Sequence, residues 1–492
     1  MKTPNPIKSL AGQTVVYGMG TIVPRLLNYM LVPVYTRVFH DQATYGQITE
    51  LYAYIAFLMV LLTYGMETAF FRYAQKGDKQ QVFNNAMSAI LLTTGIFVLL
   101  SLLLYKKFAG WMQYSGNSEY ILLVVFIVAF DAITAIPFAM LRKLNQARRF
   151  AIIRLINVAF TLLLNFCAII YFPIFFGDLA IRLLGQETSL VVWVFIANLL
   201  ASLLSLLMLG SVFRHFKFVI EWEILKPMLR YAWPVLIIGL AGMVNEMLDK
   251  VLLKYLLNDK TNAMAELGIY GANYKLGVLM TLFIQMFRYA AEPFFFAEAE
   301  KKQAQALFAR VMNYFLIAGL IIFLGVTLYL DIFKHFIGEA YRDGLFIVPI
   351  ILIANLFNGV YYNLAIWYKL TDRTLSGAVI ALFGALITIG LNFWLIPIYG
   401  YLGAAWTHLI TYFLMMTLSY VWGQRVYPVP YQPGRLIFYT VLAFLLYYIS
   451  LYFKGLQPLS IYLFNTALLV VFLIIVFLIE RKSASGINTS GL

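Results

Sequence analysis

The segment Leu229–Leu257, LRYAWPVLIIGLAGMVNEMLDKVLLKYLL, is long and apolar enough to cross a bilayer, yet its second half is polar. That half carries one amide and four ionisable side chains: Asn245, Glu246, Asp249, Lys250 and Lys254. An ionised side chain near the bilayer centre costs roughly 2.5 to 3.5 kcal/mol on insertion scales. Lipid cannot be the only neighbour of this helix, so the rest of the chain must supply a polar cavity or partners that neutralise the charges.

The composition of the whole chain is that of a membrane protein. Of its 492 residues, 62% are hydrophobic and only 12% are charged, and the mean hydropathy is +0.83. The formal net charge is +14. The basic residues are nevertheless scattered between apolar runs rather than clustered with aromatic residues, which argues against nucleic acid as a partner. The single cysteine, Cys167, excludes an intrachain disulfide framework.

Apolar runs long enough to span a bilayer recur along the chain. Fourteen are predicted, near residues 10–39, 44–68, 84–105, 120–141, 151–172, 188–210, 229–257, 267–290, 307–330, 345–366, 376–397, 401–423, 436–453 and 459–479. We therefore expect an all-α polytopic membrane protein with fourteen transmembrane helices. The connections on the side of the N-terminus contain 22 lysines and arginines and those on the opposite side contain 7, which predicts that both termini are cytoplasmic.

An internal repeat divides the chain. The three matches pair residues 28–37 (NYMLVPVYTR) with 245–254 (NEMLDKVLLK), 64–76 with 289–301, and 164–166 with 391–393. Their common order predicts two six-helix halves, residues 1–225 and 226–424, with the last two helices in residues 425–492. Because an even number of helices separates equivalent positions, the halves should run parallel, related by a pseudo-two-fold axis along the membrane normal.

Polar side chains inside the predicted spans are candidates for a binding site. In transporters built from repeats, substrate sites lie near the bilayer midplane between the halves. Arg25 lies deep in the first predicted helix, whereas Arg37 lies near its outer end and could equally reach the interface by snorkelling. The predicted substrate-binding residues are Arg25, Asn28, Arg37, Asn245, Lys250, Lys254 and Lys275.

Acidic side chains inside the spans are candidates for ion coupling. They are Asp131, Glu246 and Asp249. Glu246 and Lys250 are four residues apart on one helical face, so we expect them to form an ion pair. Asp249 and Lys254 are then left without an opposite charge at favourable spacing in the helix, except that Asp249 adjoins Lys250 in sequence, and Asp131 has no local partner.

The sequence contains no recognisable catalytic or metal-binding set. The four histidines, His40, His215, His335 and His408, are far apart in sequence, and no HExxH or GxSxG arrangement occurs. The connections between predicted helices are short, so few polar groups can be positioned for acid-base chemistry. We expect a protein that is not an enzyme and has no metal site and no cofactor.

Several short motifs are individually loose, but the order in which they occur along the chain is specific. The first predicted helix reads PRLLNYMLVPVYTRVF (residues 24–39) and is followed by Tyr45-Gly46. The seventh contains Asp249-Lys250 and is followed by Gly268, Tyr270 and Lys275. Over its whole length the chain resembles the bacterial polysaccharide or O-antigen flippases of the multidrug/oligosaccharidyl-lipid/polysaccharide exporter superfamily.

Individual residues carry this resemblance. Arg25 and Arg37 match the first-helix arginines of the family, and Pro293 matches a proline that commonly ends its eighth helix. Where the family often has Asp-Arg in the seventh helix, this chain has Asp249-Lys250, which keeps the charge but loses the bidentate geometry of a guanidinium.

The resemblance implies a flippase that moves an undecaprenyl-diphosphate-linked oligosaccharide from the cytoplasmic to the periplasmic leaflet by alternating access. Arg25, Lys250 and Lys275 would bind the diphosphate and sugar head, and a proton or sodium gradient would drive transport. The resemblance also implies a monomer in the bacterial inner membrane, with a lipid-linked oligosaccharide and membrane lipid as partners. Glycan polymerases and glycosyltransferases are further candidate partners.

Three alternatives stay open from the sequence. A lipid II flippase shares the helix number and a cationic cavity, so the sequence separates it poorly. A multidrug or cation antiporter of the same superfamily should lack the last two helices and have a more acidic, aromatic cavity. A membrane-embedded glycan polymerase or ligase normally needs a large periplasmic loop, for which the short connections leave no room.

Overall fold

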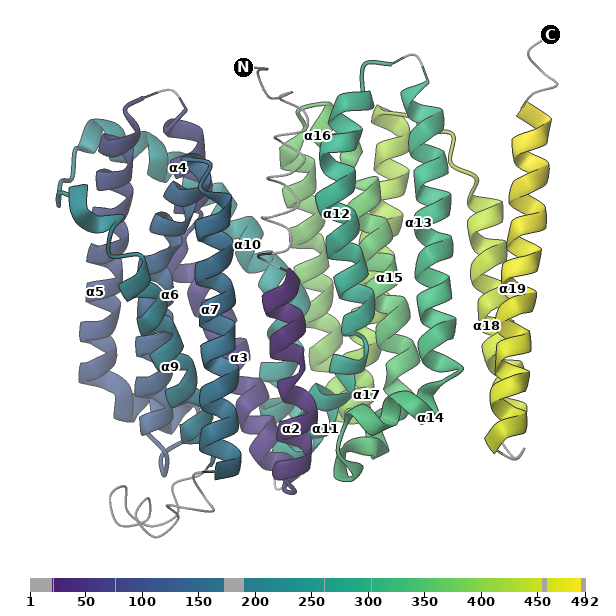
Figure 1. Cartoon of the computed structure of the whole chain (residues 1–492), viewed down its shortest axis with the longest axis horizontal. Coiled ribbons are helices and arrows are strands. Elements are labelled where there is room, and N and C mark those ends of the chain that lie inside the picture. Colours follow the sequence, from purple (N-terminus) through teal and green to yellow (C-terminus); the bar gives the residue numbers. More distant parts are fainter. Residues whose placement is uncertain are drawn as a thin grey trace. The chain divides into compact units, whose positions relative to one another are not determined.

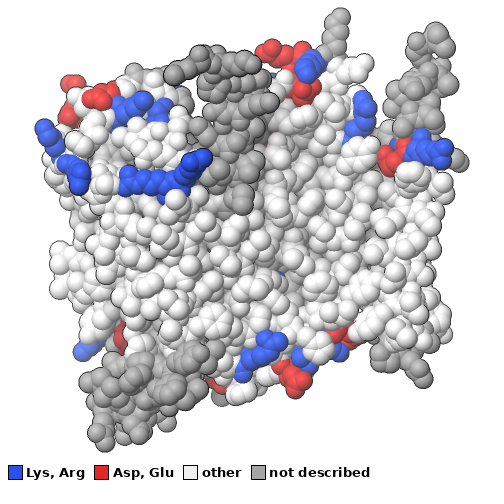
Figure 2. Space-filling view, in the orientation of Figure 1, with Lys and Arg blue, Asp and Glu red and all other residues white. Residues whose placement is uncertain are grey.

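The computed structural model of the chain consists of helices and short connections (Figure 1). It describes residues 20–487, apart from residues 21, 76, 172–189, 261, 302 and 454–457. The described residues contain no β-strand. On the visible face, charged side chains gather at the two ends of the helices of each unit, with an uncharged band between (Figure 2). The predicted class, an all-α multi-pass membrane protein, is confirmed.

Contacts divide the chain into two compact units, residues 1–268 and 269–492. The first contains α2 (Leu31–Val38), α3 (Gln42–Thr63), α4 (Met66–Tyr73), α5 (Lys79–Trp111), α6 (Glu119–Lys143), α7 (Ala147–Phe166), α9 (Leu190–Met208), α10 (Trp222–Leu256) and the start of α11 (Ala263–Leu276). The second contains the rest of α11, α12 (Val278–Glu298), α13 (Ala304–Thr327), α14 (Leu330–Phe333), α15 (Val348–Leu364), α16 (Ile366–Leu370), α17 (Thr374–Val426), α18 (Pro433–Tyr452) and α19 (Pro458–Ile487). Short π and 3-10 segments lie at Cys167–Tyr171, Phe213–His215, Lys334–Phe336 and Glu339–Ile347.

The unit boundary differs from the boundaries predicted from the repeat. The repeat places α10 at the start of the second half, but α10 packs against α3 and α4 and lies in the first unit. Helices α18 and α19 pack against α13 within the second unit. The repeat shows which segments are equivalent in sequence, whereas the compact units show which segments pack together. The predicted domains, residues 1–225, 226–424 and 425–492, therefore stay a prediction.

Ten helices among the described residues are long and apolar enough to span a membrane, or eleven if the bent pair α11 and α12 is one span. Helix α10 is not among the ten, and α17 counts once. The predicted span near residues 10–39 lies partly outside the described residues. The predicted number of fourteen and the cytoplasmic termini are therefore not tested.

Helix α17 consists of two antiparallel segments. Its 53 residues would extend about 80 Å if straight, whereas the hydrocarbon core of a bilayer is about 30 Å thick. Gly400, with φ 57° and ψ −138°, interrupts the helix in a conformation that glycine adopts readily. Thr388 Oγ1 donates a hydrogen bond to Thr411 Oγ1 at 3.2 Å although 23 positions separate them. The two segments match the predicted spans near residues 376–397 and 401–423.

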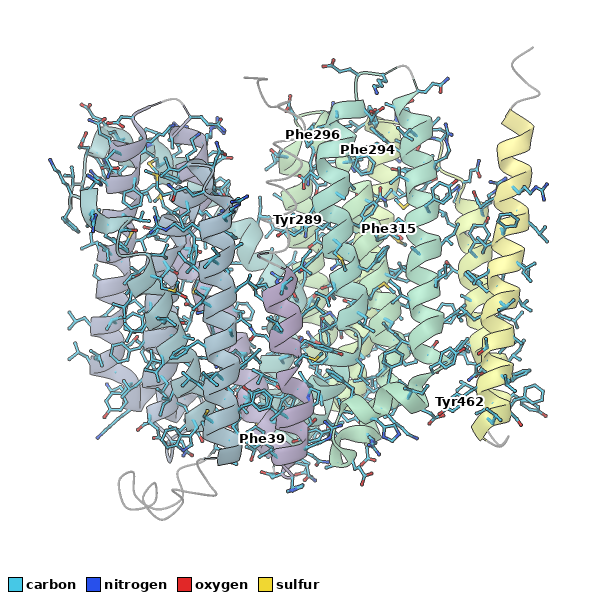
Figure 3. All side chains as sticks on the ribbon, in the orientation of Figure 1. Phe39, Tyr289, Phe294, Phe296, Phe315 and Tyr462 are labelled. Carbon is cyan, nitrogen blue, oxygen red and sulfur yellow. The ribbon has the colours of Figure 1, made fainter. Side chains whose placement is uncertain are left out.

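Aromatic side chains lie near both ends of the helices in the second unit (Figure 3). Tyr289, Phe294 and Phe296 of α12 are exposed toward one end. Toward the other end, Tyr462 of α19 stacks on Tyr329, with ring centres 6.4 Å apart. This distribution fits aromatic belts at the two membrane interfaces.

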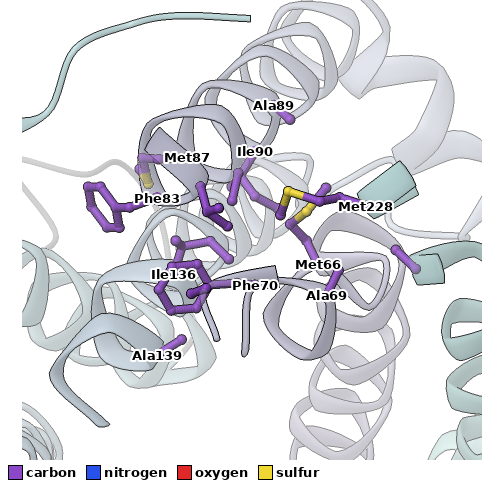
Figure 4. Close-up of a cluster of buried hydrophobic side chains, with 14 of the residues drawn as sticks. Met66, Ala69, Phe70, Phe83, Met87, Ala89, Ile90, Ile136, Ala139 and Met228 are labelled. Atoms are coloured by element: carbon purple, nitrogen blue, oxygen red, sulfur yellow. The ribbon is translucent and has the colours of Figure 1, made fainter. Parts of the chain in front are cut away.

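A buried apolar cluster fixes the start of α10 in the first unit (Figure 4). Met66 and Phe70 of α4, Phe83 and Met87 of α5 and Met228 of α10 are fully buried in it. Inside a bilayer such a cluster stabilises the fold mainly through dense dispersion contacts, because lipid tails are as apolar as the side chains. Helix α10 thus packs through apolar side chains near its start and carries its buried polar side chains in its second half.

The internal repeat is visible as matching ion pairs. In the first unit, Glu67 of α4 bonds Arg142 at the end of α6. In the second unit, Glu292 of α12 bonds Lys369 of α16, with 2.7 Å between Nζ and Oε1. Glu67 and Glu292 are equivalent in the repeat, and each bonds the basic residue near the end of another helix. The units therefore share an internal contact as well as a sequence pattern.

Two glycines of the flippase-like motif let α3 and α11 touch. A Cβ on Gly46 would lie 2.1 Å from the carbonyl oxygen of Met264, and a Cβ on Gly268 would lie 2.0 Å from that of Gln42. Both distances are far inside van der Waals contact, so neither position accepts a side chain without movement of the backbone. Small residues at such crossings are typical of helix packing in membranes.

Replacing Gly46 with alanine should push α3 and α11 apart and destabilise the first unit by about 1–3 kcal/mol, the usual cost of overpacking. Gly95→Ala in α5 is the matched control, because nothing lies within 4 Å of its added Cβ. The measurement is thermal unfolding of the purified full chain in detergent. A midpoint for Gly46→Ala equal to that of Gly95→Ala would contradict the contact.

Candidate functional site

The polar half of α10 is buried against protein. Four of its side chains are only 2–6% exposed: Asn245, Asp249, Lys250 and Lys254. Glu246 alone is exposed. The expectation that this helix needs neighbours other than lipid is therefore confirmed for four of the five polar side chains.

Lys254 forms a buried ion pair with Glu50 of α3, with 3.1 Å between Nζ and Oε2. The ammonium also donates to the carbonyl oxygen of Met112 at 2.6 Å and lies 3.9 Å from the centre of the Tyr114 ring. Glu50 is 0% exposed and accepts hydrogen bonds from the hydroxyls of Tyr114 at 2.5 Å and Tyr54 at 3.2 Å. Both charges are fully partnered, and the pair ties α10 to α3 and to the connection after α5.

Tyr114 lies in that connection, outside the spans. Burial raises the pKa of its phenol well above the usual value, and the negative charge of Glu50 raises it further. The phenol therefore stays protonated at physiological pH and can keep donating to Glu50. This network was not predicted from the sequence. The sequence feature that could have indicated it is Glu50, an acidic residue within the apolar run 44–68.

The predicted ion pair between Glu246 and Lys250 is wrong. Lys250 Nζ lies 3.3 Å from Asp249 Oδ1, and it donates to the backbone carbonyl oxygen of Glu246 at 2.8 Å. The Glu246 carboxylate is on the exposed side of α10, so it does not share the buried face. Asp249, which adjoins Lys250 in sequence, is the residue that neutralises Lys250.

The first predicted helix presents three of its candidates at the protein surface. Arg25 and Asn28 are exposed. Arg37 is also exposed, and its Nη1 donates to the carbonyl oxygen of Pro33 at 3.0 Å. Arg37 therefore stabilises the last turn of α2, as basic residues commonly do at a helix C-terminus. Lys275, in the second unit, is exposed as well.

Asp131 has partners that the sequence did not predict. Its carboxylate lies within interaction range of Ser202 of α9 and of Arg154 of α7. The Arg154 guanidinium lies 4.1 Å from the centre of the Phe138 ring, a cation–π contact. Arg154 was not predicted as a site residue.

Arg154 also lies within electrostatic range of Arg25, Arg142 and Glu67. Since Glu67 bonds Arg142, Asp131 is the other acidic group within electrostatic range of Arg154. Arg25, Glu67, Asp131, Arg142 and Arg154 are here called the arginine cluster. It holds three positive and two negative charges, and all its members except Arg25 lie in helices long and apolar enough to span a membrane. An excess of positive charge at this depth suits the binding of an anion.

The structure thus places the predicted residues in two different environments. It brings Arg25 and Asp131 into one cluster, and it places Asn245, Asp249, Lys250 and Lys254 in a buried region where the charges pair with protein. Among the residues that the structure describes, no three His, Cys, Asp or Glu side chains lie together as metal ligands. The substrate-binding and ion-coupling roles of all these residues remain predictions.

Solved structures share this fold at low sequence identity. The structure titled lipid II flippase MurJ, inward closed conformation, matches with a TM-score of 0.68 and 13% identity, over 94% of this chain and 98% of that one. An inward-facing multidrug resistance MATE family transporter of the MOP superfamily matches with a TM-score of 0.58 and 14% identity, over 84% of this chain and 97% of that one. No curated protein sequence matches the chain.

The chain thus has the helical fold of these two membrane proteins. A family model described as "Polysaccharide biosynthesis protein" matches residues 10–299, more than half of the chain. The protein belongs to the polysaccharide biosynthesis protein family. The resemblance stated from the sequence motifs is therefore confirmed.

Removing one member of the Glu50–Lys254 pair should destabilise the protein strongly, because the other charge is left buried without a counter-charge. Glu50→Gln or Lys254→Met should cost about 3–5 kcal/mol, whereas the double variant should recover much of this loss. Glu246→Gln, an exposed site on the same helix, is the control. Thermal unfolding of the full chain measures the effect. If the double variant were as unstable as the sum of the single ones, the charge pairing would not be the cause.

Proposed function

We propose that the protein is a flippase for a polyprenyl-diphosphate-linked oligosaccharide, carried on undecaprenyl and moved from the cytoplasmic to the periplasmic leaflet by alternating access. The family description and the fold shared with a lipid II flippase support a lipid-linked glycan as cargo. The protein would act as a monomer in the bacterial inner membrane. Glycan polymerases and glycosyltransferases would be its functional partners.

The observation that carries the proposal is that the positive charge of Arg25 acts on Arg154. Two like charges repel each other, and the repulsion is strongest where water is scarce. Both side chains are exposed rather than packed away. A diphosphate brings at least two negative charges, and guanidinium groups bind phosphate oxygens bidentately, so the bound head would relieve the repulsion.

The buried lysines have a different place in this proposal. In this conformation Lys250 is paired with the carboxylate of Asp249 in its own helix, and Lys254 is paired with that of Glu50 in α3. These lysines would hold α10 in position rather than contact the cargo. Lys275, which is exposed in the second unit, stays a candidate for binding the sugar head.

Asp131 is the proposed coupling group. It is the carboxylate that faces Arg154, and its protonation would leave Arg154 and Arg25 to the diphosphate. Proton binding and cargo binding would then favour each other. Asp249 is a weaker candidate because it already neutralises Lys250, and the exposed Glu246 has no such link to the cluster. A sodium ion at Asp131 would act in the same sense as a proton.

A lipid II flippase is the second candidate, favoured by the match to MurJ. Lipid II carries the same polyprenyl diphosphate, so the arginine cluster would serve it equally, and only the sugar would differ. A multidrug antiporter is disfavoured because an excess of arginine suits anions rather than cationic drugs.

Neutralising either arginine should weaken binding of the cargo. Arg25→Gln and Arg154→Gln should each lower the affinity of the purified full chain for undecaprenyl diphosphate by roughly tenfold or more, since each removes charge-assisted hydrogen bonds. Lys107→Gln, an exposed basic residue at the end of α5, is the control. Binding is measured by native mass spectrometry, and glycan export by complementation in cells. Unchanged affinity in both arginine variants would exclude the cluster as the diphosphate site.

Asp131→Asn should mimic the protonated state. We expect tighter binding of undecaprenyl diphosphate, by roughly several-fold, because a negative charge near the arginines is removed. Transport in proteoliposomes should become independent of the ion gradient. Glu246→Gln provides the comparison, with wild-type behaviour expected. Wild-type transport that ignores collapse of both the proton and the sodium gradient would contradict a coupled mechanism.

A further inference from the structure

The connection between α9 and α10 contains an extended segment, residues 216–221, here called the connector. Its backbone is bonded to a polar stripe on α5. The amide of Lys217 donates to Asn84 Oδ1 at 3.3 Å and the amide of Val219 donates to Ser88 Oγ at 3.0 Å. The connector therefore has one fixed conformation, although it contributes no helix or strand.

The amide of Glu221 completes the pattern by donating to Asn85 Oδ1 at 2.6 Å. The bonded amides are those of alternate residues, as in the edge of a sheet, with side chains of α5 in place of a second strand. At the start of the connector, Phe216 packs edge-on against Phe83 of the buried cluster, with ring centres 6.3 Å apart. The connector is thus attached to the first unit by hydrogen bonds along one edge and by the packing of Phe216 at its start.

The other side presents large apolar side chains. Phe218 is 60% exposed, Ile220 42% and Trp222, the first residue of α10, 60%. In an extended chain, residues two apart project to the same side, so these three form one apolar row. The row lies between the ends of two membrane-spanning helices, where aromatic side chains commonly sit at the level of the lipid headgroups.

Basic side chains surround this row. Arg214, Lys217, Lys226 and Arg230 are exposed, against the exposed acidic residues Glu221 and Glu223. Figure 2 shows Lys and Arg gathered at this end of the first unit. The lysine and arginine distribution predicts that this end is cytoplasmic, the side on which anionic lipids give a membrane its negative surface potential.

We propose that the connector and its flanking basic residues form a docking surface for anionic phospholipid of the adjoining leaflet. Phe218, Ile220 and Trp222 would enter the region between headgroups and acyl chains, while Arg214 and Lys217 contact the phosphates. The charge of the surface complements an anionic headgroup and not a zwitterionic one. A soluble acidic protein could bind only if the apolar row faced water. The position of the row beside the helix ends disfavours this.

Bromolipid quenching of Trp222 tests this surface in the full chain reconstituted into phosphatidylcholine vesicles. The bromine is carried either by a minor phosphatidylglycerol component or by an equal amount of phosphatidylcholine. Because the chain has eight tryptophans, the Trp222 signal is the difference between wild type and Trp222→Phe. We expect stronger quenching by the brominated phosphatidylglycerol, and a loss of this preference in high salt.

Two variants separate charge from fold. Arg214→Gln with Lys217→Gln should reduce the preference for phosphatidylglycerol by roughly fivefold or more, in line with the attraction of a basic residue to an anionic surface. The connector is held by backbone amides, so this change leaves its hydrogen bonds intact. Lys106→Gln with Lys107→Gln, at the opposite end of α5, is the matched control and should keep the preference.

Any of three results would overturn the proposal. One is equal quenching of Trp222 by both brominated lipids. Another is quenching of Trp222 by aqueous iodide but by neither lipid, which would place the row in water and favour a soluble partner. The third is a retained preference in the Arg214→Gln, Lys217→Gln variant, because the charges would then have no part in binding.

Discussion

The fold depends on one constraint, which is that a charge buried between apolar helices must be neutralised by protein. Helix α10 meets it with two ion pairs of different kinds. Asp249 neutralises Lys250 within the helix, and Glu50 neutralises Lys254 from α3. The second pair lowers the cost of burying two charges, and it also fixes the end of α10 to another helix and to the connection after α5. The apolar cluster around Met228 fixes the other end.

The intramembrane charges fall into two groups: those that other protein groups neutralise, and those that keep an excess of positive charge. Those of α10 are buried and paired, which suits a structural part that holds a helix in place. Those of the arginine cluster retain an excess of positive charge and include exposed side chains. Keeping such an excess among apolar helices is costly, and a cost of this kind is typical of groups that bind ligands. This contrast is why we assign the cargo to Arg25 and Arg154 rather than to the lysines of α10.

The repeat explains shared contacts but not all functional differences. Glu67 with Arg142 and Glu292 with Lys369 are the same contact in two units. In contrast, Arg37 and Lys254 are equivalent in sequence and differ in role. Arg37 caps its own helix from an exposed position, whereas Lys254 is buried against Glu50. A duplicated sequence position therefore does not fix the neighbours of its side chain, because those come from other helices.

The sequence alone determined the membrane-spanning class, the position of nearly every helix and the existence of a repeat, because each follows from local runs of apolar residues or from alignment. It also identified α10 as a helix that must find polar partners. It did not determine those partners: the predicted pairing of Glu246 with Lys250 was wrong, and Glu50 and Arg154 were not predicted as site residues. Helical spacing places side chains on faces of one helix, but which face meets which neighbour depends on packing between helices distant in sequence. That packing joined Lys254 to Glu50, 204 positions apart, and brought Arg154 within electrostatic range of Arg25.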